Sequence, residues 1–193
     1  MSLIRAFIAV EIPREIQQNI HKETATLRKE IGGLVRWVPP ENMHLTLKFL
    51  GDISPSSVEF LIQMLRNEAE NVSGFSLQLT GLGSFPSLKR PRVVYIGFHA
   101  PAGLDALQRG IEAAARRLGY EAEDRPFSPH LTLGRVRQNV TAADQQKIRR
   151  VIEGTQVDVL GTARVDSVHL YKSELKPGGS VYTRLYSAPL KKQ

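Results

Sequence analysis

The tetrapeptide His-Leu-Thr-Leu occurs twice in the chain, at His44–Leu47 and again at His130–Leu133. In a β-strand successive side chains point to opposite faces, so the histidine and threonine of each copy share one face and the two leucines share the other. Each copy can bury its leucines in a core and present an imidazole and a hydroxyl on the opposite side. One such copy in each half of a small chain predicts two matched half-sites that face one cleft.

The elements around the two copies repeat as well. A strand over residues 43–50 precedes an amphipathic helix over 55–70, and a strand over 130–136 precedes a helix over 141–153. We therefore predict an α+β fold in which residues 1–193 form a single bilobal domain. Each of two similar lobes has an antiparallel sheet with helices on its outer face, and the active-site cleft lies between the sheets. The other expected strands cover 4–12, 34–38, 75–82, 92–99, 157–171 and 181–188, and the other expected helices cover 14–30 and 104–118.

Composition limits the chemistry and the setting. The 193 residues include no cysteine, which excludes disulfides, thiolate nucleophiles and cysteine metal sites and fits a reducing compartment. The early apolar run over residues 6–10 is too short for a signal sequence, and no stretch approaches membrane-spanning length, so we expect a cytoplasmic protein. The formal net charge of +7 favours an anionic partner such as a nucleic acid, although a solvated basic surface is the alternative interpretation.

Paired imidazoles and hydroxyls can move protons around a phosphate. Histidine, with an ordinary pKa of about 6.5, can both donate and accept protons near neutral pH, and a threonine hydroxyl can hydrogen-bond the non-bridging oxygens. A metal site is the main alternative. Two histidines supply only two ligands, however, whereas catalytic zinc usually takes three from the protein, and no carboxylate stands at ligand spacing from either motif. We expect no metal and no cofactor.

Segments around both motifs carry a family resemblance that extends over the whole chain. They are residues 5–13 (RAFIAVEIP), Trp37-Val38, residues 41–51 (ENMHLTLKFLG), residues 125–135 (RPFSPHLTLGR), residues 170–173 and residues 182–190. With these flanks, the chain resembles the two-histidine (2H) phosphoesterase superfamily, and within it the RNA 2′,3′-cyclic phosphodiesterases once named 2′-5′ RNA ligases.

The resemblance implies a two-lobed fold with a pseudo-twofold axis through a basic cleft. It also implies hydrolysis of a terminal 2′,3′-cyclic phosphate on RNA to a 2′-phosphomonoester. The family's roles assign His44 as proton donor and His130 as proton acceptor, with Thr46 and Thr132 as their catalytic partners. The reverse reaction, 2′-5′ RNA ligation, uses an RNA hydroxyl in place of water.

Three further residues are expected to bind substrate. The family often carries an arginine at the place of Arg135; strict alternation puts Arg135 on the face opposite His130, but a bulge at Gly134 would return it to the cleft. Lys48 lies on the His44 face by alternation, and Tyr171 is expected to line the groove. His21, His99 and His169 have no repeat partner and are given no chemistry.

The residues leave two other functions open. One is a 2H phosphodiesterase that acts on a small cyclic nucleotide or a 2′-5′ oligoadenylate. The other is a non-catalytic module that binds RNA ends, although binding alone does not need two titrating imidazoles. We expect RNA with a 2′,3′-cyclic phosphate end as the partner, no membrane association and a monomer.

Overall fold

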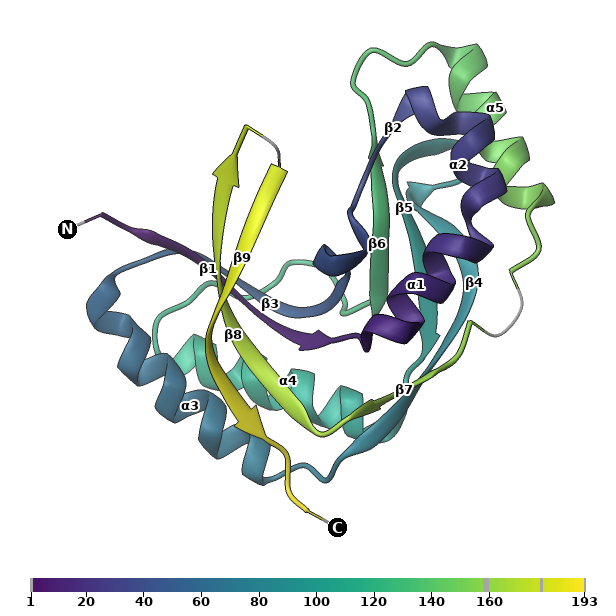
Figure 1. Ribbon diagram of the computed structural model, residues 1–193. Coiled ribbons are helices and arrows are strands. Elements are labelled where there is room, and N and C mark those ends of the chain that lie inside the picture. Colours follow the sequence, from purple (N-terminus) through teal and green to yellow (C-terminus); the bar gives the residue numbers. More distant parts are fainter. Residues whose placement is uncertain (1, 158–159, 178, 193) are drawn as a thin grey trace.

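The computed structural model describes residues 2–157, 160–177 and 179–192 and contains one strongly curled antiparallel sheet (Figure 1). Eight strands follow the order β7-β4-β5-β6-β3-β1-β8-β9, and the short strand β2 pairs with β6 beside this path. The expected strand over 157–171 includes residues 158–159, which lie outside the described residues, and the rest of it contains β7 and the start of β8. The strands are β1 (Ile4–Glu11), β2 (Val35–Trp37), β3 (His44–Ile53), β4 (Phe75–Ser87), β5 (Arg90–His99), β6 (His130–Val136), β7 (Thr162–Val165), β8 (Ser167–Lys176) and β9 (Gly179–Pro189).

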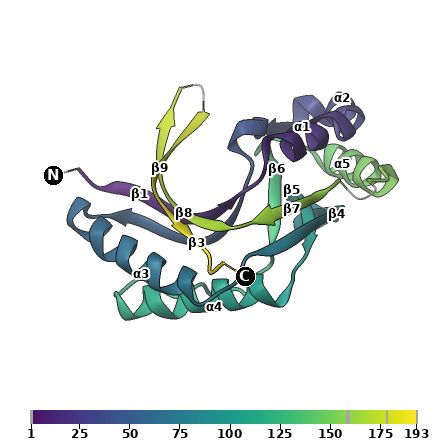
Figure 2. The same ribbon diagram turned by 60° about the horizontal axis from the view of Figure 1, so that its bottom comes forward.

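The helices form two groups on the convex side of the sheet. α3 and α4 pack on each other and cover the half made by β3, β8 and β9, whereas α2 packs on α5, which covers β4 and β5 (Figure 2). The single helix expected over 14–30 is divided at Thr24, whose hydroxyl donates to the carbonyl of Ile20 at 2.7 Å. The helices are α1 (Arg14–Glu23), α2 (Ala25–Ile31), α3 (Val58–Glu70), α4 (Ala102–Arg117) and α5 (Ala142–Gly154).

The two motif strands are direct neighbours, which corrects the expectation of two separate sheets. β3 and β6 pair antiparallel at Leu45 and Leu131, the second residue of each motif. Both leucines are completely buried in the common core. Their burial stabilises each motif strand and also joins the two halves of the molecule. Outward from this pair, β3, β1, β8 and β9 follow on one side and β6, β5, β4 and β7 on the other.

Both motif strands carry a β-bulge at the same place, directly after the threonine. In β6 the register moves from Tyr95–Thr132 to Val94–Gly134, so Leu133 has no partner on β5. A bulge of this kind puts two consecutive residues on one face and shifts the alternation of those that follow. Leu133 and Gly134 are accordingly both buried, and the next residue, Arg135, is exposed.

In β3 the register moves from Ala9–Thr46 to Ile8–Lys48, which leaves Leu47 without a partner on β1. Leu47 and Lys48 are both buried, and Phe49 is 59% exposed. The ring of Phe49 lies 6.3 Å from that of Phe7, which also stacks on His44. Phe49 therefore lies on the His44 face of the sheet, and Arg135 occupies the matching position in the other half.

Candidate active site

The paired strands bring the four polar motif side chains to one face of the sheet. Leu45 pairs with Leu131 in the antiparallel register, so the residues on either side of each leucine lie on the face opposite the two leucines. His44, Thr46, His130 and Thr132 are all half-buried. The two imidazoles and the two hydroxyls therefore share one face of the sheet.

Each imidazole is held by a backbone carbonyl two residues before it. Nδ1 of His44 lies 2.8 Å from the oxygen of Asn42, and Nδ1 of His130 lies 2.7 Å from the oxygen of Ser128. A carbonyl can only accept, so Nδ1 carries the hydrogen in both rings. Nε2 is left for a ligand in both cases, as an acceptor when the imidazole is neutral and as a donor when it is protonated.

The surroundings of His44 are aromatic. Phe7 stacks on its ring at 4.8 Å, Tyr182 meets it edge-on at 5.1 Å, and Tyr171 stacks on the far side of Phe7 at 5.3 Å. Burial lowers the pKa of His44; the hydrogen bond to Asn42 opposes this effect, and the charge of His130 lowers the pKa further.

The second histidine has a different aromatic frame. Phe85 and Tyr95 stack on each other at 4.3 Å, and both meet the ring of His130 edge-on, at 4.9 and 5.7 Å. Both rings come from the β4–β5 hairpin, which pairs with β6. The two half-sites are thus matched in their motifs and in the hydrogen bonds that orient the imidazoles, and they differ in the residues that surround each ring.

A cavity of about 220 Å³ opens beside His44. Tyr171 lines it, as predicted for a groove residue. Tyr182, Arg184 and Glu11 also line it, and the motif analysis missed all three. Alternation along β9 puts Tyr182 and Arg184 on one face, but only the pairing of β9 with β8 brings that face to the cavity.

The structure does not bring Lys48 to the histidine face. The bulge turns Lys48 to the convex side, where it is 2% exposed and its Nζ lies 3.0 Å from Oε2 of Glu112 on α4. Nζ also donates to the carbonyl of Glu121 at 2.5 Å. The expectation from strict alternation was wrong here, because alternation reverses across a bulge.

Arg135 is turned the other way by the bulge on β6. It emerges on the face of His130 and Thr132, as expected if Gly134 interrupts the alternation. A Cβ at Gly134 would stand 2.5 Å from Cγ1 of Val35, so glycine allows β2 to pack closely against the bulge. The structure thus groups Arg135 and Tyr171, but not Lys48, with the four motif residues.

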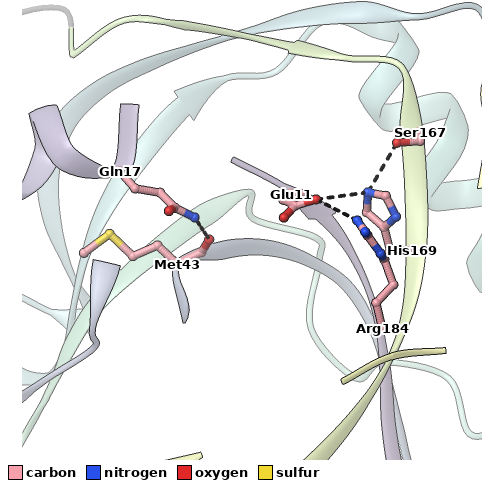
Figure 3. A network of polar contacts seen from close by, with 6 residues as sticks. All are labelled: Glu11, Gln17, Met43, Ser167, His169 and Arg184. Carbon is pink, nitrogen blue, oxygen red and sulfur yellow. Dashed lines mark hydrogen bonds and ion pairs between the residues drawn. The ribbon is translucent and has the colours of Figure 1, made fainter. Parts of the chain in front are cut away.

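Glu11 and Arg184, which line the cavity, belong to a polar network with His169 and Ser167 (Figure 3). Glu11, which pairs with His44 across β1 and β3, accepts from Nη1 of Arg184 at 3.1 Å and lies 3.8 Å from Nε2 of His169. His169 is buried, which lowers its pKa, and Nε2 also contacts the hydroxyl of Ser167 at 3.3 Å. This network holds Arg184 at the cavity wall.

On α1, Gln17 donates to the carbonyl of Met43 at 3.2 Å, so it anchors the residue that precedes His44 (Figure 3).

Within residues 2–157, 160–177 and 179–192 there is no group of three or more histidine and carboxylate side chains that could hold a metal ion. No helix in the same ranges is long and apolar enough to cross a membrane.

Comparison with known proteins agrees with this arrangement. The model of the LigT-like phosphoesterase family matches the chain twice, over residues 10–95 and 98–182, with one motif in each match. The chain is 33% identical over 180 residues to an RNA 2′,3′-cyclic phosphodiesterase of Methanothermobacter thermautotrophicus, covering 93% of this chain and 95% of the relative. It is 30% identical over 185 residues to the enzyme of the same name from Archaeoglobus fulgidus, covering 94% and 98%.

Two crystal structures share the fold over nearly the whole chain. The protein TT0787 of Thermus thermophilus superposes with a TM-score of 0.81 at 28% identity, covering 98% of this chain and 99% of that one. Escherichia coli LigT in complex with 3′-AMP superposes with a TM-score of 0.77 at 29% identity, covering 97% and 98%. Fold and motifs together define a phosphoesterase of the two-histidine class. The chain belongs to the LigT-like phosphoesterase family, in which its relatives are RNA 2′,3′-cyclic phosphodiesterases.

Proposed function

We propose that this chain hydrolyses the terminal 2′,3′-cyclic phosphate of RNA to a 2′-phosphomonoester by paired-histidine acid–base catalysis. The observation that carries the proposal is the matched orientation of His44 and His130. Both lie on one face, and both have Nδ1 bound to a carbonyl, so both present Nε2 to a ligand. The names of the relatives supply the substrate class.

In the proposed reaction, Nε2 of neutral His130 takes a proton from water as the water oxygen attacks phosphorus. The bond between phosphorus and the 3′ oxygen breaks, and protonated His44 donates its Nε2 proton to that oxygen, so the phosphate stays on the 2′ oxygen. The hydroxyls of Thr46 and Thr132 donate to the non-bridging oxygens, where negative charge increases in the transition state. Solvent then returns both histidines to their starting protonation states.

The environment of His44 suits the role of proton donor. Burial lowers its pKa, which makes the imidazolium a stronger acid toward the departing alkoxide. A bound phosphodiester brings a negative charge next to the ring, and this charge favours the protonated form in the complex. Arg135 and Tyr171 contact the substrate from the two half-sites in this scheme.

We further infer that the two halves are related by a pseudo-twofold axis between Leu45 and Leu131. The two family matches, one on each side of residue 96, support this inference, as does the strand order on either side of the pair. We propose that the single bilobal domain acts as a monomer in the cytoplasm. The same geometry serves 2′-5′ RNA ligation when an RNA hydroxyl replaces water.

The decisive assay is incubation with an oligonucleotide that ends in a 2′,3′-cyclic phosphate, in the presence of EDTA. We expect a 2′-phosphorylated product, identified by phosphatase treatment and end mapping, and near-complete loss of turnover in His44→Ala and His130→Ala. His21→Ala is the matched control because His21 is exposed on α1, and it should retain full activity. Binding without turnover by the wild type would favour an RNA-end-binding module, and turnover of cyclic mononucleotides alone would favour the small-substrate alternative.

A further inference from the structure

Two arginines stand directly across from each other beside the active site. Arg36 on β2 pairs with Arg135 on β6 in the antiparallel register. Side chains directly opposite on neighbouring strands lie on the same face, so Arg36 shares the face of Arg135 and therefore that of His130 and Thr132. Both arginines are exposed, and neither forms an ion pair among the residues that the structure describes.

This arrangement is unfavourable for the isolated protein. Like charges at directly opposite positions destabilise a strand pair. On its other side Arg135 pairs with Val93, which offers no compensating charge. In the other half, the position that matches Arg135 is Phe49, which pairs with Phe7 and forms an apolar contact. An unneutralised arginine pair on the concave face indicates a ligand that carries the opposite charge.

The short strand β2 is what produces the pair. It lies beside the path of the other eight strands and adds Arg36 to the half-site of His130 alone. β2 is held against β6 by the close approach at Gly134 and by the hydrogen bond from the nitrogen of Val38 to the oxygen of Leu133 at 2.8 Å. The positive charge is therefore built on a fixed strand.

The distance from the histidines selects the part of the ligand that the pair can reach. Arg135 follows His130 by four strand steps and one bulged residue, which corresponds to roughly 13 Å along the strand. That separation places the pair beyond the reacting phosphate and at the level of the nucleotides that precede it in an RNA chain. Arginine guanidinium groups bind phosphate oxygens in bidentate fashion, so two adjacent arginines suit a sugar–phosphate backbone.

We propose that Arg36, together with Arg135, binds the backbone phosphates on the 5′ side of the cyclic end, and so makes the enzyme prefer oligonucleotides to cyclic mononucleotides. The inference rests on the proposed function and names the surface that holds the body of the RNA. Arg36 acts through substrate binding and takes no part in proton transfer.

The test compares Arg36→Gln with Arg150→Gln, which removes the same charge from the exposed side of α5. The substrates are a short oligonucleotide with a 2′,3′-cyclic phosphate end and a nucleoside 2′,3′-cyclic phosphate. For Arg36→Gln we expect KM for the oligonucleotide to rise about tenfold with kcat retained. A rise of this size corresponds to the loss of one charge-assisted hydrogen bond. Activity on the mononucleotide should stay within about twofold of wild type, since that substrate has no second phosphate.

Salt dependence gives an independent measure. For the oligonucleotide, the slope of log kcat/KM against log salt concentration should become shallower by about 0.7, as expected for one lost contact to a single strand. The melting temperature should be unchanged or higher, because the substitution removes a like-charge contact. An equal loss on both substrates, or an effect no larger than that of Arg150→Gln, would overturn the inference.

A binding measurement separates this inference from the proposed reaction. Fluorescence anisotropy of a labelled oligonucleotide with a 2′-phosphate end reports affinity whether or not turnover occurs. Weaker binding by Arg36→Gln than by Arg150→Gln supports the arginine pair even if the wild type proves inactive, which would refute the proposed function alone. Equal binding by both variants refutes the arginine pair alone.

Discussion

Replacing Lys48 by methionine should destabilise the protein and leave substrate recognition intact. The Lys48 ammonium and the Glu112 carboxylate are 3.0 Å apart, with side-chain exposures of 1% and 20%. At that distance the attraction is about 5–6 kcal/mol for an effective dielectric constant of about 20. Desolvation of both groups offsets part of this attraction. In the variant, the Glu112 carboxylate still accepts a hydrogen bond from the backbone N–H of Glu123 at 3.2 Å and keeps some contact with water. We expect the free energy of unfolding to fall by about 3 kcal/mol, at the lower end for a broken buried pair.

Urea unfolding measures this loss directly, and for a chain of this size it corresponds to a melting temperature lower by about 6–12 °C. The double variant Lys48→Met, Glu112→Leu should recover most of the stability, because no unpaired charge remains. Below its melting temperature Lys48→Met should have a KM close to wild type. Unchanged stability together with a large rise in KM would refute the reasoning, since it would mean that Lys48 faces the substrate.

Three further predictions concern the motifs, the bulge and the buried histidine. Thr46→Ala and Thr132→Ala should each lower kcat by about 10²–10³ through the loss of one donor to the phosphate oxygens, with urea unfolding unchanged; equal losses of activity and stability would indicate a structural role instead. Gly134→Ala should destabilise the protein by about 1–3 kcal/mol, because the new methyl group meets Val35 at 2.5 Å; a neutral result in urea unfolding would contradict the close packing of β2 on the bulge. Because burial lowers the pKa of His169, the unfolded chain takes up a proton below about pH 6.5 that the folded protein does not, so stability falls as the pH drops. His169→Gln should therefore lose less stability than wild type between pH 7.5 and 5.5 in urea titrations, and identical losses would exclude this contribution.

The repeated motif predicted the central features of the site because they depend on local alternation. Leucines on one face of each strand and histidine with threonine on the other follow from the strand period alone. The pairing of Leu45 with Leu131 could not be read in the same way. It joins positions far apart in the chain, so two sheets and one continuous sheet were equally compatible with the local pattern.

The bulges mark where local prediction ended. Gly134 indicated that alternation could fail near Arg135, whereas at Lys48 the sequence contains no glycine and no sign of the extra residue. The bulge there is defined by the pairing of β3 with β1, which leaves Leu47 without a partner. Tyr182 and Arg184 were missed for a related reason, since they reach the cavity only through the pairing of β9 with β8.

The joint between the two motif strands is a single pair of leucine residues wide. The spacing of the two imidazoles therefore depends on one strand bridge whose side chains are both buried in the interior. Shortening either leucine would change the spacing of groups that it never touches. In the proposed reaction, the placement of the acid and the base thus rests on two side chains of the core.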